Sequence, residues 1–267
     1  MRAAFIPKRV KLSFFYTIII FVLLIILTWI NTRLFNDPMI LHILDGVARG
    51  LLAVLAIFLL RKIMRGSEFQ FSFSFLYAKK AIFASTFIII GIVIMIINML
   101  NAAEINIPYR PLPTYVMISL LRNLSSGIFE EVWFRGLLMT AALYYYGNTV
   151  KGRLLIVSAA SFLFGLGHFQ GGLFLIIVTF IAGLAFSAAY AYSANLLILG
   201  VLHGLWNSAQ MFGIHQSRNM ALSTITEIAM ISLFVPMIIF AIIITIRSEP
   251  FSKKMDRLLC LRYRKNN

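Results

Sequence analysis

The sequence predicts an all-α protein that crosses a membrane repeatedly, a polytopic bundle of about eight transmembrane helices. Hydrophobic residues make up 61% of the 267 residues and charged residues only 12%, whereas a soluble globular protein is roughly half apolar and a quarter charged. A chain of this length cannot bury so large an apolar fraction in its own interior, so part of it must face lipid. The composition therefore excludes a soluble enzyme or a soluble binding domain.

Eight apolar segments have about the length that a helix needs to cross the hydrocarbon core, roughly 20 residues. The fourth is too long for a simple span, and we expect it to bend at Gly127. No internal repeat or separate soluble domain is evident, so we predict one integral-membrane domain over residues 1–267. The segments are Ser13–Ile30, Met39–Leu60, Ala81–Leu100, Thr114–Tyr145, Leu154–Phe169, Leu173–Tyr192, Asn195–Phe212 and Leu222–Ile246.

The Lys and Arg residues predict the orientation of this bundle. With the N-terminus inside, 18 of them fall on the cytoplasmic side of the predicted spans, and only Arg33, Arg110 and Arg218 fall outside. Cytoplasmic loops carry an excess of such residues, so both termini are expected in the cytoplasm. The formal net charge of +15 then indicates anionic lipid at the cytoplasmic face as a partner, not nucleic acid. A short chain without further domains favours the plasma membrane of a bacterium.

Ionisable residues inside the predicted spans are costly, and they mark either a functional site or a structural pair. Asp45 and Arg49 are four residues apart on one face of the second predicted helix. They are expected to neutralise each other. His42, near the start of the same helix, is interpreted as a residue of the membrane interface.

The fourth predicted helix carries two adjacent glutamates, Glu130 and Glu131. Adjacent residues on a helix point about 100° apart, so these two are expected not to share a partner. Arg135 lies four residues after Glu131 and can pair with it, which leaves Glu130 without a local partner. A lone carboxylate in a membrane helix requires a polar, wet pocket, and it suits a general base or a proton carrier.

Three further polar side chains are expected to surround Glu130. His168 lies on the following predicted helix, at a similar distance from the turn that joins the two helices, so antiparallel packing brings it to a similar depth. His203 and Asn207 are four residues apart and share one face of the seventh predicted helix. Four polar groups from three helices therefore predict one shared site.

Together these residues form three motifs: Glu-Glu-x-x-x-Arg (Glu130, Glu131, Arg135), Phe-x-x-x-His (Phe164, His168) and His-x-x-x-Asn (His203, Asn207). In this order, and in a polytopic chain, they resemble the CPBP family of CAAX-type intramembrane endopeptidases. That family includes type II prenyl-protein proteases and bacterial proteins of bacteriocin immunity or processing. The resemblance places a protease core at about residues 114–213.

The resemblance implies cleavage of a peptide bond by water within a helical membrane cavity. It implies that Glu130 is the base and that His168 is its partner in activating water. His203 and Asn207 would stabilise the oxyanion, and Glu131 with Arg135 would form a structural ion pair. The implied substrate is a peptide or membrane protein, possibly a lipidated one.

The cofactor requirement has two interpretations. Glu130, His168 and His203 are the types of residue that bind catalytic zinc, and the family has been described both as metalloproteases and as glutamic proteases. However, the His-Glu-x-x-His motif of zinc peptidases is absent, and asparagine is an uncommon zinc ligand. We therefore expect no cofactor, with zinc as the alternative. A cysteine or serine nucleophile is not expected, because Cys260 lies in the polar tail and neither Ser125 nor Ser126 has a local base.

Two other functions remain open at this point. A transporter would use Glu130 and the histidines to relay protons, although the sequence shows no repeat and no paired broken helices. A non-catalytic immunity or scaffold protein would retain the fold alone, although the complete set of polar residues argues against it.

Overall fold

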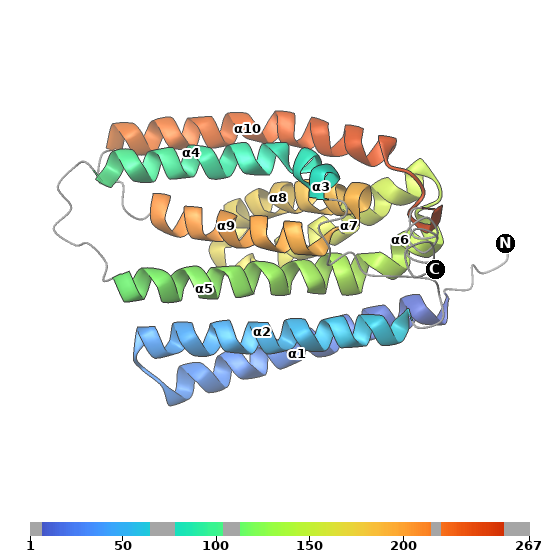
Figure 1. Ribbon diagram of the computed structural model, residues 1–267, viewed down its shortest axis with the longest axis horizontal. Coiled ribbons are helices and arrows are strands. Elements are labelled where there is room, and N and C mark those ends of the chain that lie inside the picture. Colours follow the sequence, from blue (N-terminus) through green and yellow to red (C-terminus); the bar gives the residue numbers. More distant parts are fainter. Residues whose placement is uncertain (1–6, 65–77, 104–112, 215–219, 254–267) are drawn as a thin grey trace, which may run out of the picture.

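The structure is a computed structural model that describes residues 7–64, 78–103, 113–214 and 220–253. All the long elements that the structure describes are helices, which confirms the all-α prediction (Figure 1). The α-helices are α1 (Lys8–Leu34), α2 (Pro38–Ile63), α3 (Ala78–Ala84), α4 (Thr86–Ala103), α5 (Pro113–Glu130), α6 (Thr140–Tyr146), α7 (Val150–Leu166), α8 (Gly172–Ser193), α9 (Leu196–Ile214) and α10 (Met220–Arg247); a π-helix, η2, spans Glu131–Met139, and a 3-10 turn, η3, spans Phe169–Gly171.

The number of membrane spans is supported only in part. Among the described residues, α1, α2 and the η3–α8 segment are each long and apolar enough to cross a membrane. The helices α3 and α4 are bent by 68° and would supply a fourth span if they are taken together. The predicted count of eight is therefore not confirmed. Among the other helices, α7 is shorter, with 17 residues.

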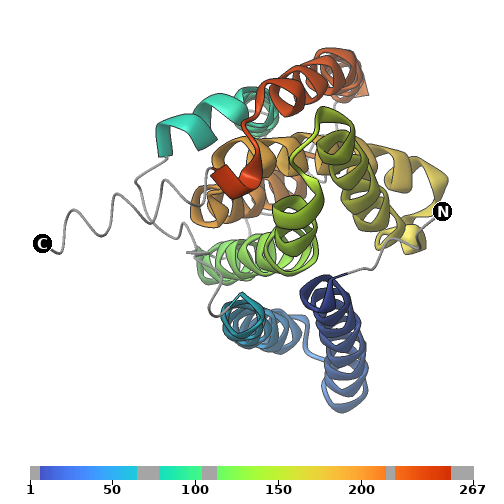
Figure 2. The same ribbon diagram turned by 90° about the vertical axis from the view of Figure 1, so that its right-hand side faces the viewer.

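The long helices run side by side along one axis and form a bundle (Figures 1 and 2). The α1–α2 hairpin forms one side, α4 and α10 form the opposite side, and α5 and α9 lie between them. The start of α1 and the end of α10 lie at the same end of the bundle. Many large apolar side chains are exposed, among them Trp29, Leu51 and Leu155. Such a surface belongs in lipid, so the chain is an integral membrane protein.

Two apolar clusters make up the core. One joins α4, α7, α8, α9 and α10, and the other joins α1, α2 and η2 with Phe164 of α7. Arg135 and His203 each contact the ring of Phe164 from the second cluster and the ring of Phe186 from the first. The predicted site residues therefore lie where the two clusters meet.

Glycines bring α5 and α9 into close contact. A β-carbon on Gly127 would lie 2.2 Å from the backbone nitrogen of Gly204, and one on Gly200 would lie 2.9 Å from the Cα of Ile128. Only a residue without a side chain allows this approach. The expectation that the chain bends at Gly127 is wrong: α5 continues to Glu130, and the backbone leaves α-helical geometry only in η2. Gly127 serves the contact with α9 instead.

Candidate active site

Glu130 ends α5 at the edge of the site, and its side chain is 13% exposed. Its Oε1 accepts a hydrogen bond of 2.7 Å from the Ser126 hydroxyl and lies 3.4 Å from Nη1 of Arg49 on α2. Its Oε2 lies 3.4 Å from Nε2 of His203 on α9. The carboxylate that seemed to lack a local partner is therefore held from three elements, and it keeps some access to the surroundings.

Glu131 is fully buried, with a side-chain exposure of 0%. Its Oε1 accepts from Nη1 of Arg135 at 2.9 Å and is 2.8 Å from Nδ1 of His203. Arg135 also donates from Nη2 to the Gly183 carbonyl at 3.1 Å, and its guanidinium lies 4.8 Å from the centre of the Phe164 ring, a cation–π contact. The structure thus contains the predicted Glu131–Arg135 pair and anchors it to α7, α8 and α9.

His203 contacts both glutamates, so the expectation that adjacent glutamates cannot share a partner is wrong. The reason is the shape of imidazole, whose two nitrogens lie on different edges of the ring. Nδ1 faces Glu131 and Nε2 faces Glu130. The ring stacks on Phe186 with centroids 4.7 Å apart and planes 24° apart. The close α5–α9 contact at Gly127 is what allows the ring to reach both carboxylates.

His168 lies in a turn and not on a helix. The expected helix through Phe169 ends instead at Leu166, within a glycine-rich stretch that favours helix termination. Nδ1 of His168 is bonded to the Phe164 carbonyl at 2.9 Å, which leaves Nε2 for another partner. His168 interacts electrostatically with Glu130, although no hydrogen bond joins the two side chains in the described part of the chain.

Asn207 lies on α9 one turn after His203 and is half-buried. Because Gly204 faces Leu124 and Gly200 faces Ile128, α9 runs antiparallel to α5. The step from His203 to Asn207 therefore leads toward the N-terminal half of α5. Within the described residues, the side chain of Asn207 makes no hydrogen bond, so its amide is available as a hydrogen-bond donor.

Two residues beside Glu130, Arg49 and Ser126, were not predicted from the sequence to belong to this site. Arg49 was expected to pair only with Asp45, and it does so at 3.0 Å, but it also donates to Ser126 at 3.2 Å and reaches Glu130. Asp45 in turn accepts from Nε of Arg122 at 2.8 Å. The four-residue spacing of Ser126 and Glu130 could have predicted the hydrogen bond between these two side chains. No sequence signal shows which face of α2 meets α5.

The described residues do not fit a metal site. No group of three or more His, Cys, Asp or Glu side chains in the described ranges is placed to hold a metal ion. Both nitrogens of His203 already face carboxylates, and the guanidinium of Arg49 lies beside Glu130. A divalent cation at Glu130 would meet this positive charge directly.

Comparison with protein families agrees with the motifs. Residues 112–209 match the family described as Rce1-like, type II CAAX prenyl endopeptidase. This segment is therefore similar to the CAAX protease family, and the resemblance drawn from the sequence is confirmed over residues 112–209. The matched segment contains every predicted site residue, while α1 and α2, with Arg49, lie outside it. Searches of curated proteins and of solved structures found no match.

Proposed function

We propose that this protein is an intramembrane endopeptidase of the CAAX type in which Glu130 activates the water that cleaves the peptide bond. The family match supports the peptidase activity. The observation that carries the choice of base is the environment of Glu130. Its carboxylate is held in place yet 13% exposed, whereas Glu131 is fully buried. Only the first of these two can meet both water and substrate.

The first chemical step is addition of water to the carbonyl carbon of the substrate. Glu130 takes one proton of the water as the oxygen bonds to this carbon, and the electron pair of the C=O bond moves to the carbonyl oxygen. Ser126 and Arg49 both donate toward Oε1, which orients the carboxylate and directs Oε2 toward the site. When the C–N bond breaks, Glu130 returns the proton to the departing amine.

Charge on the carbonyl oxygen needs hydrogen-bond donors that are already in place. His203 in its doubly protonated form donates from Nδ1 to Glu131 and from Nε2 toward the reacting oxygen. Asn207 supplies a second donor from its amide. Glu131 and Arg135 act through His203, since they fix the position of its ring. We assign His168 to orienting the water beside Glu130.

The substrate that we propose is a peptide or membrane protein with an attached lipid, since the matched family is described as prenyl endopeptidases. A lipid-bearing substrate suits a site that lies among exposed apolar helices. We assign no cofactor to the reaction.

The experiment is cleavage of a synthetic peptide with an S-prenylated cysteine by the purified protein in detergent, with the product termini identified by mass spectrometry. The unmodified protein should release one new amine and one new carboxylate, and Glu130→Gln should not. Ser126→Ala removes one hydrogen bond from Glu130 and should slow turnover by only about ten-fold.

Three results would change the mechanism. If Ser126→Ala loses as much activity as Glu130→Gln, the serine is the nucleophile. If a chelator abolishes cleavage and zinc restores it, the metal-free mechanism is wrong. Cleavage that survives in Glu130→Gln rejects Glu130 as the base.

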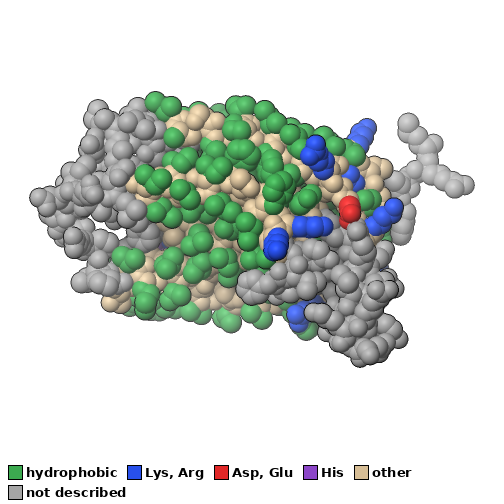
Figure 3. Space-filling view, turned by 45° about the horizontal axis from the view of Figure 1, so that its top comes forward, with side chains coloured by type: hydrophobic (Ala, Val, Ile, Leu, Met, Phe, Trp, Pro, Cys, Tyr) green, Lys and Arg blue, Asp and Glu red, His purple; other side chains and the backbone are tan. Residues whose placement is uncertain are grey.

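We further propose that both ends of the chain face the cytoplasm. The start of α1 and the end of α10 lie at one end of the bundle (Figure 1), and the Lys and Arg side chains visible on one face gather toward that end (Figure 3). Reporter fusions after Ser217 and Asn267 test this orientation. The first should report an external position and the second a cytoplasmic one; an external C-terminus contradicts the proposal.

A further inference from the structure

The segment that carries Glu131 and Arg135 is a π-helix, η2. π-Helical turns are rare, occur mostly as single-turn bulges inside α-helices, and are frequent at functional sites. Each such bulge takes in one extra residue, so the residues beyond it are turned by about 100° relative to an uninterrupted α-helix. The direction in which Arg135 points from the end of α5 therefore depends on whether η2 keeps its π-helical geometry.

Helix α1 is bonded to η2 at two points. The hydroxyl of Ser13 donates to the carbonyl oxygen of Leu137. The indole nitrogen of Trp133 donates to the carbonyl oxygen of Thr17 at 3.1 Å. The Trp133 ring also stacks on Phe21, with centroids 5.8 Å apart and planes 20° apart. One bond therefore reaches the middle of η2 and the other lies one turn later, and both fix η2 against α1.

The burial of Ser13 is unusual for α1. Most of this apolar helix faces outward, and the neighbouring Phe14 and Phe15 are 52% and 55% exposed. Within α1 the buried side chains are those of Ser13 and Ile20. A hydroxyl without a hydrogen bond is costly in such surroundings, whereas an apolar side chain has no such cost. The serine is therefore explained by its bond to η2 and not by packing alone.

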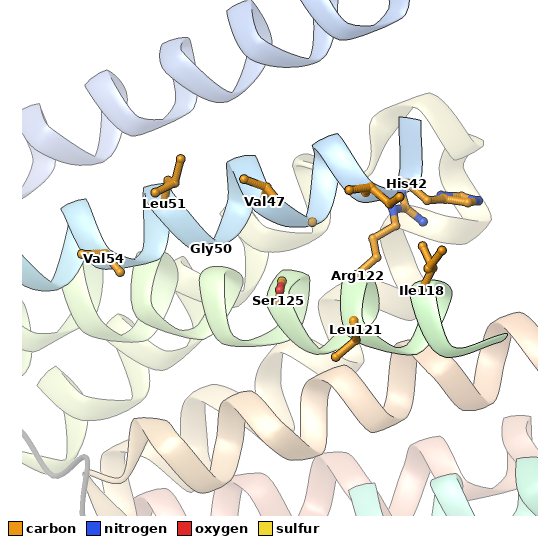
Figure 4. A pocket seen from close by; sticks show the side chains of 11 residues that line it. His42, Val47, Gly50, Leu51, Val54, Ile118, Leu121, Arg122 and Ser125 are labelled. Carbon is orange, nitrogen blue, oxygen red and sulfur yellow. The ribbon is translucent and has the colours of Figure 1, made fainter. Parts of the chain in front are cut away.

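The other helix of the hairpin, α2, makes a different contribution. The ion pairs of Asp45 and Arg49 lead from α2 to α5. Beside them lies a groove of about 400 Å³, whose lining includes Gly50 of α2 and Ser125 of α5 (Figure 4). The α2–α5 contact thus leaves open space, while α1 meets η2 directly through two hydrogen bonds.

The position of η2 is transmitted to the candidate site. Thr140, the first residue after η2, donates to the Arg135 carbonyl at 3.1 Å. Arg135 donates to Glu131 at 2.9 Å, and Glu131 lies 2.8 Å from Nδ1 of His203. The side chains of Glu131 and Arg135 are 0% exposed, so water has no access to replace a contact that is lost. A change in the geometry of η2 therefore changes the position of the His203 ring.

We propose that Ser13 is a positioning residue for the reaction, because its hydroxyl holds η2 in π-helical geometry. Through Arg135 and Glu131, this geometry fixes the ring of His203. The inference rests on the proposed function. It also assigns a role to α1, which lies outside the matched segment 112–209. Ser13 contacts none of the reacting groups, so it acts only through η2.

The test combines kinetics with hydrogen exchange on the full chain in detergent. Ser13→Ala should lower kcat for the prenylated peptide by about 10- to 100-fold, as expected for a small displacement of catalytic groups, with KM little changed. Backbone amides of η2 should exchange about ten-fold faster, the equivalent of one hydrogen bond, while those of α9 stay unchanged. Ser13→Thr keeps the hydroxyl and should restore most of kcat and the slow exchange.

A matched control comes from the same helix. Thr32 has a hydroxyl that donates to carbonyl groups of α1 itself, those of Thr28 and Trp29. Thr32→Ala should therefore leave both kcat and the exchange of η2 unchanged.

A second variant tests the same contact if the Ser13 variants do not fold. Trp133→Phe removes the N–H that donates to Thr17 and keeps an aromatic ring beside Phe21. It should give the same pattern, a lower kcat and faster exchange in η2.

Unchanged exchange in η2, or an unchanged kcat, in Ser13→Ala overturns the inference. Faster exchange in all helices together with a normal kcat also overturns it, because Ser13 then contributes only to overall stability. The proposed function fails separately. If the unmodified protein cleaves no prenylated peptide, that function is contradicted, and exchange in η2 still decides whether Ser13 holds this segment. If the unmodified protein and Ser13→Ala cleave equally well, only the role of Ser13 is contradicted.

Discussion

Glu130 and Glu131 are neighbours in the chain with the same side chain, yet they face two different regions of the molecule. On the α8–α9 side, Glu131 is fully buried and is bonded to Arg135 and His203. On the α2 side, Glu130 is partly exposed and lies beside Ser126 and Arg49. The step of one residue between α5 and η2 therefore separates a structural carboxylate from one that is available for chemistry.

The two regions also differ in how closely their helices pack against α5. α9 approaches α5 so closely that Gly127, Gly200 and Gly204 leave no room for side chains. α2 approaches α5 through a polar chain of four residues and leaves a cavity beside it. The α9 side therefore fixes the geometry of the site, and the α2 side is the more open of the two. Substitutions on the two sides should therefore fail in different ways.

The largest effect is expected on the buried side. Arg135→Ala leaves Glu131 buried without its main partner, which typically costs about 3–5 kcal/mol. The variant should express poorly or melt at a much lower temperature in detergent. Arg33→Ala is the matched control and should change the free energy of unfolding by about 0.5 kcal/mol or less. An Arg135→Ala protein as stable as this control would show that Glu131 is stabilised by His203 alone.

The next effect concerns Asn207, which should matter for rate and not for stability. Its side chain makes no hydrogen bond to the described residues, so Asn207→Ala should keep the melting temperature. Loss of an oxyanion donor should lower kcat by about 10²–10³-fold. Turnover and melting temperature are measured on one preparation. Normal kcat would remove Asn207 from the site.

The smallest effect is expected at Arg49. Arg49→Gln removes a contact of 3.4 Å with Glu130, while the shorter bond from Ser126 remains and Asp45 keeps Arg122. Turnover should fall by about ten-fold, with little loss of stability. Arg49→Lys should recover part of the lost turnover, because it restores the positive charge. A loss as large as that of Glu130→Gln would make Arg49 part of the reaction and not a positioning residue.

The sequence predicted the helical class, the membrane setting and the family because these depend on composition and on short motifs. The i, i+4 rule found the Glu131–Arg135 pair, since both partners lie within one turn of helix. It could not place Arg49 beside Glu130, because these two residues lie 81 positions apart in the sequence, on different helices. Nor could it show His203 between both glutamates, because this depends on how closely three glycines let α9 approach. The count of eight spans stays a prediction, since three of the described helices, or four with α3 and α4 taken together, are long and apolar enough to cross a membrane.

The measurement that tests the account most directly compares Glu130→Gln and Glu131→Gln, with turnover of a prenylated peptide and melting temperature recorded on the same preparations. Glu130→Gln should keep the melting temperature and lose about 10²–10⁴-fold in rate, because it can no longer accept a proton from water. Glu131→Gln should first lower the melting temperature, because it weakens the bonds to Arg135 and His203. A stable but inactive Glu131→Gln protein together with an active Glu130→Gln protein would contradict the division of roles between the two glutamates.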